Sequence, residues 1–90
     1  MRCLHQITDI TRLKIAQPLM STDDGLLLLE AATSLASDQQ RLGTLPLGMR
    51  VFVLEKDLQA RALTPLQAVE VISDSQWVAL TLEAEGVCSW

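Results

Sequence analysis

Aromatic residues are scarce in this chain of 90 residues, which has no tyrosine, one phenylalanine and two tryptophans. Unpaired bases therefore find no aromatic platform on which to stack. Basic residues are also few, because seven lysines and arginines stand against eleven aspartates and glutamates and leave a net charge of -4. Such a chain has no basic surface that holds phosphates by releasing counterions, so we expect no direct binding to nucleic acid.

Cysteine is almost absent as well. The two cysteines, Cys3 and Cys88, are separated by nearly the whole chain. This spacing differs from the C-x-x-C pairs of metal sites and provides no disulfide framework. We therefore expect no bound metal, and a protein that works in the reducing cytoplasm.

Long apolar runs are missing: the longest, such as residues 26–29, have four residues, whereas a membrane-spanning helix needs about 20. The amino terminus lacks the apolar stretch of a secretion signal, so we expect a mature protein that begins at Met1 and stays out of membranes. A hydrophobic content of 49%, with four glycines and three prolines, predicts one folded domain over residues 1–90. Because so small a chain buries only about 60 to 65% of its unfolded surface, partner subunits are expected.

Short apolar runs alternate with stretches of helical spacing along the chain. Strands are predicted over residues 2–5, 26–29, 50–54 and 68–72. Helices are predicted over residues 9–17, ended by Pro18, over 30–38 and 55–63, and from the capping residues 73–75 to Gly86; residues 39–49 form a loop. Residues 87–90 form a short edge strand or a packed tail. Strands that are apolar on both faces predict an α/β fold, a three-layer sandwich with a mainly parallel sheet of four or five strands.

Ligands of such sheets gather beyond the carboxyl ends of the strands, which are here predicted near His5, Glu30, Glu55 and Ser73. No glycine-rich phosphate loop follows any predicted strand, and there is no G-x-S-x-G motif. We therefore expect neither a nucleotide nor another cofactor.

Catalysis by a nucleophile would depend on few residues. His5 is the only histidine; we place it at a strand end near solvent and favour a structural role, bonded to neighbouring backbone, over a role in proton transfer. Cys3, in a predicted buried strand, is expected to be a core residue with a raised thiol pKa. Cys88 is expected to be exposed, but no basic residue lies within five positions of it, so its role as a sulfur carrier is the less favoured alternative.

Four further residues are candidates for contact with a partner. Asp57 and Arg61 are one helical turn apart and form either a solvated pair, which we favour, or part of an interface. Trp77 is either a core residue of an amphipathic helix or a partner contact. Trp90, at the extreme end, has little of its own chain left to cover it, which indicates docking on another molecule.

Five motifs extend along the whole chain in a common order. They are Leu4-His5, the run from Asp24-Gly25 through four leucines, Val53-Leu54-x-x-Asp57-Leu58-x-Ala60-Arg61-x-Leu63, Trp77-Val78-x-Leu80-Thr81, and Trp90. Each motif is weak alone, but together and at this spacing they resemble the TusB/DsrH family of small sulfur-relay subunits, which implies a DsrE/DsrF/DsrH-like domain.

Three departures from the family pattern stand out. The central leucines are followed by Glu30-Ala31-Ala32, where the family often has Gln, an acidic residue and Gly, and this puts a ligand contact at that strand end in doubt. Ala62 stands where the family often has Gly. Some relatives have a cysteine between the first helix and the second strand, but residues 16–24 contain none, which excludes persulfide chemistry there.

The resemblance implies a cytoplasmic subunit that assembles with TusC-like and TusD-like subunits into a hetero-oligomer. The TusD-type subunit would have the persulfide-bearing cysteine, receive sulfur from TusA and pass it to a TusE-like acceptor for 2-thiolation of the tRNA wobble uridine. The present chain would then be a non-catalytic assembly subunit. Three alternatives stay open: a persulfide carrier that uses Cys88, a DsrH-type subunit of a sulfur-oxidation complex, and a homo-oligomer when the chain is alone.

Overall fold

Five parallel strands form one sheet in the computed structural model, which describes residues 1–90. The strands are β1 (Cys3–Ile7), β2 (Gly25–Leu28), β3 (Arg50–Leu54), β4 (Glu70–Ile72) and β5 (Gly86–Ser89). Their order across the sheet is β4-β3-β2-β1-β5, so the last strand returns to the opposite edge and pairs with the first. The predicted α/β class and the mainly parallel sheet are confirmed.

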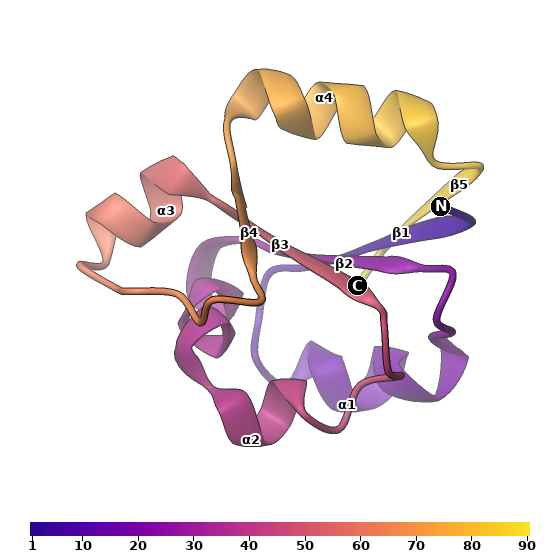
Figure 1. The fold of residues 1–90 in the computed structure, drawn as a ribbon, viewed down its shortest axis with the longest axis horizontal. Coiled ribbons are helices and arrows are strands. Elements are labelled where there is room, and N and C mark those ends of the chain that lie inside the picture. The colour runs from indigo at the N-terminus through magenta and orange to yellow at the C-terminus, as the bar shows by residue number, and fades with distance from the viewer.

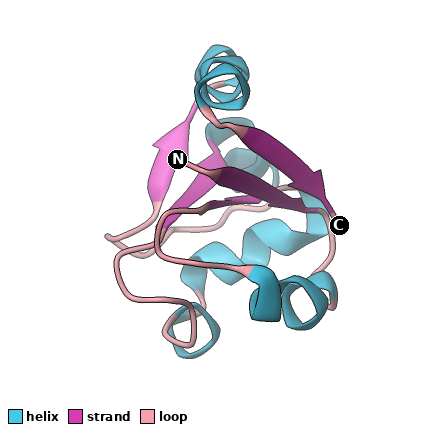
Figure 2. Ribbon diagram, turned by 90° about the vertical axis from the view of Figure 1, so that its right-hand side faces the viewer, coloured by secondary structure: helices cyan, strands magenta, loops and turns pink.

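Helices cover the sheet on both sides (Figure 1). The α-helices are α1 (Arg12–Ala16), α2 (Gln39–Leu42), α3 (Glu55–Ala60) and α4 (Asp74–Glu83), and the 3-10 helices are η1 (Gln17–Leu19) and η2 (Glu30–Ser37). Seen from the side, α4 lies alone above the sheet while α1 and α2 lie below it, which gives the three predicted layers (Figure 2). No helix has the length and apolar character needed to cross a membrane.

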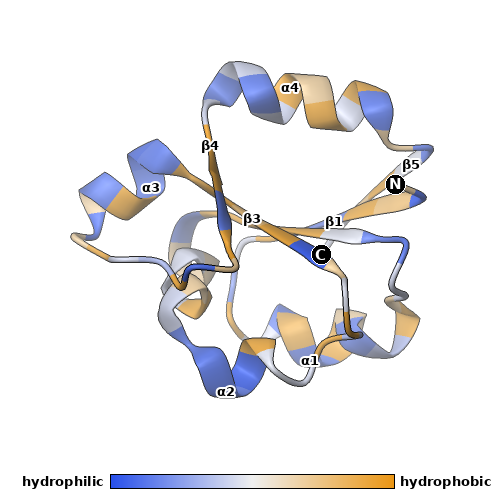
Figure 3. Ribbon diagram, in the orientation of Figure 1, coloured by the Kyte–Doolittle hydropathy of each residue, from blue (hydrophilic) through white to orange (hydrophobic).

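The strands are apolar on both faces because each face of the sheet has its own core. The hydrophobic colouring of most of β3 in Figure 3 reflects this. Leu26 and Leu28 pack on one face with residues of α1 and η2, whereas Leu27 and Phe52 pack on the other with Leu80 of α4. Gly25 begins β2 at a crowded point, since a Cβ there would collide with Met1 and lie 3.1 Å from the Phe52 ring. Because the leucines of residues 26–29 contribute in turn to the two cores, β2 is buried on both faces at the centre of the sheet.

Several predicted helices differ from those in the structure. The predicted helix 9–17 is shortened to α1, which ends at Ala16, just before Pro18 as predicted; Pro18 itself lies inside the 3-10 helix η1 that follows. The predicted helix 30–38 is a 3-10 helix, and α2 occupies part of the predicted loop 39–49, where the Asp38 side chain caps the helix by accepting from the N–H of Arg41. A capping box at Ser73 and Gln76 begins α4, as the capping residues predicted.

The first strand is longer than predicted, and this changes the place of His5. β1 continues to Ile7, so His5 lies in the middle of a strand and is only 3% exposed. The prediction that His5 marks a strand end near solvent is therefore wrong. Residues 86–89 form the edge strand that was one of the two alternatives for the tail.

Candidate functional site

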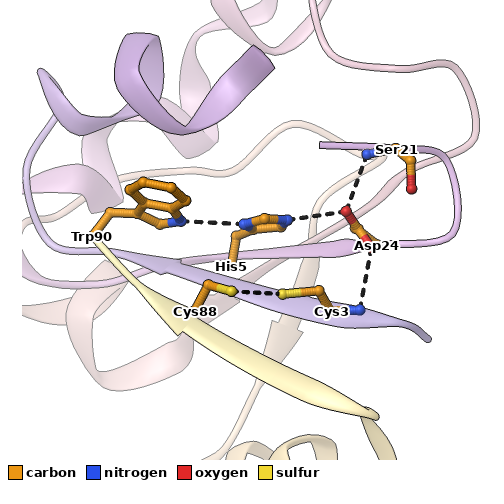
Figure 4. Close-up of polar contacts among 6 residues, drawn as sticks. All are labelled: Cys3, His5, Ser21, Asp24, Cys88 and Trp90. Carbon is orange, nitrogen blue, oxygen red and sulfur yellow. Dashed lines mark hydrogen bonds and ion pairs between the residues drawn. The ribbon is translucent and has the colours of Figure 1, made fainter. Parts of the chain in front are cut away.

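The pairing of β1 with β5 brings the two ends of the chain together. His5 lies opposite Cys88, and Cys3 lies opposite Gly86, two residues out of register with Cys88. Side chains two residues apart on a strand point to the same face, so Cys3, His5 and Cys88 share one face at this edge of the sheet. Asp24 and Trp90 join them there (Figure 4). We call these five residues the edge cluster.

Asp24 is the buried acceptor of the edge cluster. Its carboxylate accepts hydrogen bonds from the N–H of Cys3 at 3.2 Å, the N–H of Ser21 at 3.1 Å and Nε2 of His5 at 3.0 Å. Burial alone would raise the pKa of Asp24. The hydrogen bonds from His5 and Ser21 and the electrostatic effect of His5 outweigh burial, so the pKa of Asp24 lies below its usual value. Asp24 is therefore an ionised carboxylate at neutral pH.

His5 is held at both ring nitrogens. The indole Nε1 of Trp90 donates to Nδ1 at 3.1 Å, and the two rings stack with centroids 6.2 Å apart. Because Nδ1 accepts, the imidazole proton is on Nε2 and is donated to Asp24. The structural role favoured for His5 fits these contacts, although its partners are side chains and not the backbone.

The two thiols of the edge cluster are in contact. The Cys3 thiol donates to Sγ of Cys88 at 3.1 Å, and no disulfide joins them. Burial is the main cause that raises the pKa of Cys3 to about 11, with the bond to Cys88 and the charge of Asp24 in the same direction. The predicted raised pKa agrees with this, but Cys3 is half-buried and lies outside both apolar cores. Cys88 is exposed, as predicted.

The chemistry available to the edge cluster follows from these contacts. The premise that no basic residue lies near Cys88 holds along the sequence but not in space, because His5 is its neighbour on β1. His5 nevertheless has no free nitrogen with which to accept a proton from Cys88. The sulfur atoms and one imidazole nitrogen all lie within 4.8 Å of one another, so they are able to hold a metal ion. Sequence spacing gave no signal of this arrangement.

The carboxyl ends of the strands, where a ligand was expected, present a different surface. Glu30, Glu55 and Ser73 directly follow β2, β3 and β4, as predicted. A shallow polar hollow there contains Glu55, Ser73 and the exposed ion pair of Lys56 with Asp74, 3.1 Å apart. All of these are exposed surface groups, and no buried side chain among them is set up as a reactive group.

The structure separates Asp57 from Arg61, two of the four candidates for partner contact. Asp57 does not pair with Arg61: its side chain accepts from the N–H of Glu30 at 3.2 Å, and α3 ends at Ala60 before Arg61. The favoured solvated pair is therefore wrong. Arg61 is exposed and has no ion-pair partner.

The two tryptophans are both anchored on their own chain. Nε1 of Trp77 donates to Oε1 of Gln6 at 2.7 Å, and its ring packs against the core beneath α4, which agrees with the core alternative. Trp90 is half-buried and packs against the other core, and its backbone N–H donates to the carbonyl of Gln6 at 2.9 Å. The argument that little of the chain covers Trp90 is wrong, and its contact with a partner stays a prediction.

Comparisons with known proteins agree with this architecture. The crystal structure of the ychN protein from E. coli is similar over the full length of both chains, with a TM-score of 0.75 and 17% sequence identity, which shows a shared fold. No curated protein matches the sequence significantly. The family model described as DsrH like protein matches residues 8–87. With its five-stranded parallel sheet and this match along nearly its whole length, the chain belongs to the DsrH-like family of sulfur-relay proteins.

Proposed function

We propose that this chain is a non-catalytic assembly subunit of a cytoplasmic sulfurtransferase complex. In that complex, TusC-like and TusD-like subunits are its partners, the TusD-like subunit has the persulfide-bearing cysteine, and a TusE-like acceptor takes the sulfur on to 2-thiolation of tRNA wobble uridine. Membership of the DsrH-like family supports the sulfur-relay assignment. The partners and the tRNA pathway are those that the family resemblance implies.

One observation carries the non-catalytic assignment: the exposed thiol of Cys88 has no base to activate it. A cysteine nucleophile needs a neighbouring base or a stabilised thiolate. The only imidazole nearby donates from Nε2 to Asp24 and accepts at Nδ1 from Trp90. The adjacent thiol of Cys3 donates to Cys88 and has a pKa raised to about 11, so it does not serve as a base.

The surface of α4 supports an assembly role. Val78 and Leu82 are one turn apart on this helix and are 60% and 82% exposed, while Val87 of β5, on the sheet face that α4 covers, is 42% exposed. A chain of this size gains stability when a partner covers such side chains. We therefore assign the outer side of α4 and β5 as the surface that contacts a partner subunit.

The test is sulfur transfer by the purified complex. The chain is co-expressed with its TusC-like and TusD-like partners, and complexes of equal size are compared after loading with labelled sulfur. A complex whose subunit has both Cys3→Ser and Cys88→Ser is expected to pass sulfur to the acceptor at the rate of the unchanged complex. Serine in place of the TusD-type cysteine is the positive control and abolishes transfer.

A persulfide carrier is the competing function, because Cys88 is exposed and within reach of an acceptor. Loss of transfer after Cys88→Ser alone, in a complex that still assembles, would show that this chain carries the sulfur and would overturn the proposal. Mass spectrometry of the chain after loading checks the same point, since a carrier gains one sulfur atom on Cys88.

A further inference from the structure

The thiol pair of the edge cluster has no part in the assembly role proposed above. Cys3, His5 and Cys88 come from opposite ends of the sequence, yet their donor atoms all lie within 4.8 Å of one another (Figure 4). We infer that these three side chains bind a divalent metal ion of the zinc type. This inference concerns the isolated chain and does not depend on which complex it joins.

The distances fit such an ion. Zinc binds thiolate sulfur at about 2.3 Å and imidazole nitrogen at about 2.0 to 2.1 Å in a tetrahedral arrangement. That geometry places two sulfur ligands about 3.8 Å apart, and a sulfur and a nitrogen ligand about 3.5 Å apart. The sulfur atoms of Cys3 and Cys88 are 3.1 Å apart, and the whole set lies within 4.8 Å. The two sulfur atoms must therefore separate by about 0.7 Å, and the distance from sulfur to nitrogen must shorten by at most about 1.3 Å, to complete the site.

The strand register favours a shared ion over a disulfide bond. Cys88 lies opposite His5, so Cys3 and Cys88 are diagonal neighbours on adjacent strands. Parallel strands lie about 4.8 Å apart and rise about 3.3 Å per residue, so the Cα atoms of these diagonal neighbours are about 8 Å apart, whereas disulfides join Cα atoms about 4.4 to 6.8 Å apart. A metal ion between the sulfur atoms spans this longer separation without moving the backbone.

Asp24 and Trp90 prepare His5 for the role of a ligand. The carboxylate of Asp24 accepts the hydrogen bond from Nε2–H and so keeps the proton on Nε2 and the lone pair on Nδ1, which is the arrangement that supports histidine ligands in metal sites. The present partner of Nδ1 is the indole N–H of Trp90, a neutral donor that an ion displaces. Trp90 is the last residue and only half-buried, so its side chain is able to move away.

The charges of the site also balance. Binding releases one proton from each thiol to solvent, and the two thiolates then neutralise the two positive charges of the ion. The fourth position of the ion faces the open hollow that contains Arg2, Ser21 and Glu85. Because its ligands come from β1 and β5, the ion fastens the edge strand to the sheet.

Cobalt is the probe for the experiment, since a thiolate-bound Co²⁺ absorbs in the near ultraviolet and a tetrahedral one absorbs strongly in the visible. The full chain, reduced and freed of metal, is titrated with Co²⁺ and then with Zn²⁺. We expect both sets of bands to saturate at one equivalent, and Zn²⁺ to bleach them. Ser89→Ala, an exposed neighbour of Cys88, is the matched control and keeps the bands.

Four variants locate the site. Cys3→Ser and Cys88→Ser each lose most of the charge-transfer absorption, and Asp24→Asn weakens Co²⁺ binding by about 10- to 100-fold because His5 loses its supporting carboxylate. Trp90→Phe binds Co²⁺ at least as tightly as the unchanged chain, since no indole competes for Nδ1. Circular dichroism confirms that each variant is folded before it is titrated.

Three results would overturn the inference. The first is the absence of charge-transfer bands when the reduced, folded chain is given excess Co²⁺. The second is bands that survive Cys3→Ser together with Cys88→Ser. The third is alkylation of the two thiols by iodoacetamide that proceeds as fast with one equivalent of Zn²⁺ as without it, because thiolates held by an ion are protected from reaction. Neither result bears on sulfur transfer by the complex, so the two proposals fail separately.

Discussion

Asp24 accepts three hydrogen bonds while it is only 7% exposed, so replacing it leaves buried donors in the edge cluster without an acceptor. In Asp24→Asn, one carboxylate oxygen becomes an NH₂ group that faces an N–H donor. A buried donor left without an acceptor costs about 1 to 3 kcal/mol. We expect the free energy of unfolding in urea to fall by about that amount in the metal-free chain.

The neighbouring aspartate provides the control for this variant. Asp23 is exposed and its side chain makes no hydrogen bond, so Asp23→Asn removes the same charge without removing an acceptor. We expect a change within about 0.5 kcal/mol for Asp23→Asn. Equal losses of stability in the two variants would mean that charge, and not the three hydrogen bonds, explains the effect.

The contacts of single residues were the part of the site least accessible to sequence reasoning. The exposure of Cys88 and the raised pKa of Cys3 follow from local pattern and were predicted. The contact between them depends on β5 pairing with β1, and no local pattern specifies which strand a terminal strand will join. The anchoring of Trp90 on His5 was missed for the same reason.

At the scale of elements, the end of α3 contains a strained residue. Ala62 follows the helix with a φ of 50°, a left-handed conformation that costs most residues about 1 to 2 kcal/mol and glycine almost nothing. The family often has glycine here, which this backbone explains. We expect Ala62→Gly to raise the free energy of unfolding by about 0.5 to 1 kcal/mol, because the greater freedom of glycine in the unfolded chain offsets part of the gain.

Another exposed alanine tests whether backbone conformation is the cause. Ala79 lies in the middle of α4, where the backbone is helical. Ala79→Gly is expected to lower the free energy of unfolding by about 0.5 to 1 kcal/mol. Both changes are measured by urea denaturation, and a loss of stability in both variants would contradict the role of the left-handed backbone at Ala62.

The edge strand β4 is joined to β3 by an ion pair that makes stability depend on pH. Arg50 donates to both carboxylate oxygens of Glu70, at 2.8 and 2.9 Å, and this bond is the main cause that lowers the pKa of Glu70. Because the pKa of Glu70 is lower in the folded chain than in the unfolded chain, the pair stabilises the fold fully at pH values above the unfolded pKa, near 4.5. This stabilisation is lost as the pH falls through the pKa of Glu70 in the folded chain.

The size of this effect is limited by solvent. The two side chains are 51% and 44% exposed, so screening reduces the contribution of the pair to less than about 1 kcal/mol. We therefore expect Glu70→Gln to lose a few tenths of a kcal/mol at pH 7 and nothing at pH 3, and the difference to shrink in high salt. A difference between the two chains that grows as the pH falls would contradict this sign.

The helices and strands were predicted well where a run of apolar residues determines the element. They were predicted poorly where capping or packing determines it. The leucine run 26–29, which contains most of β2, and the β-branched run of β3 mark their strands without ambiguity. The short helix α2 was missed because Gly43 and Pro46 indicate a loop, while the cap by Asp38 and the packing of Leu42 on the core decide otherwise. In η2, an apolar period alone does not separate a 3-10 helix from an α-helix.

At the scale of the whole molecule, the sheet has two open edges. β5 is exposed along all four of its residues, and β4 is exposed at two of its three. An exposed edge strand is a template for association with another chain. Val87 of β5 lies on the sheet face that α4 covers, so the proposed partner surface joins the exposed apolar residues of this helix to the open edge.

Leu82 is the side chain that best tests this surface, since it is 82% exposed and contributes almost nothing to the fold of the single chain. Leu82→Lys places a charge where a partner would bury an apolar group, so we expect at least a tenfold loss of affinity, about 1.4 kcal/mol, when binding to the TusC-like and TusD-like partners is measured. Leu47→Lys is the matched control, because Leu47 is 93% exposed in the loop before β3, away from α4. We expect both variants to keep the unfolding midpoint of the unchanged chain. If Leu47→Lys weakens assembly while Leu82→Lys leaves it intact, the partner contacts the other side of the sheet.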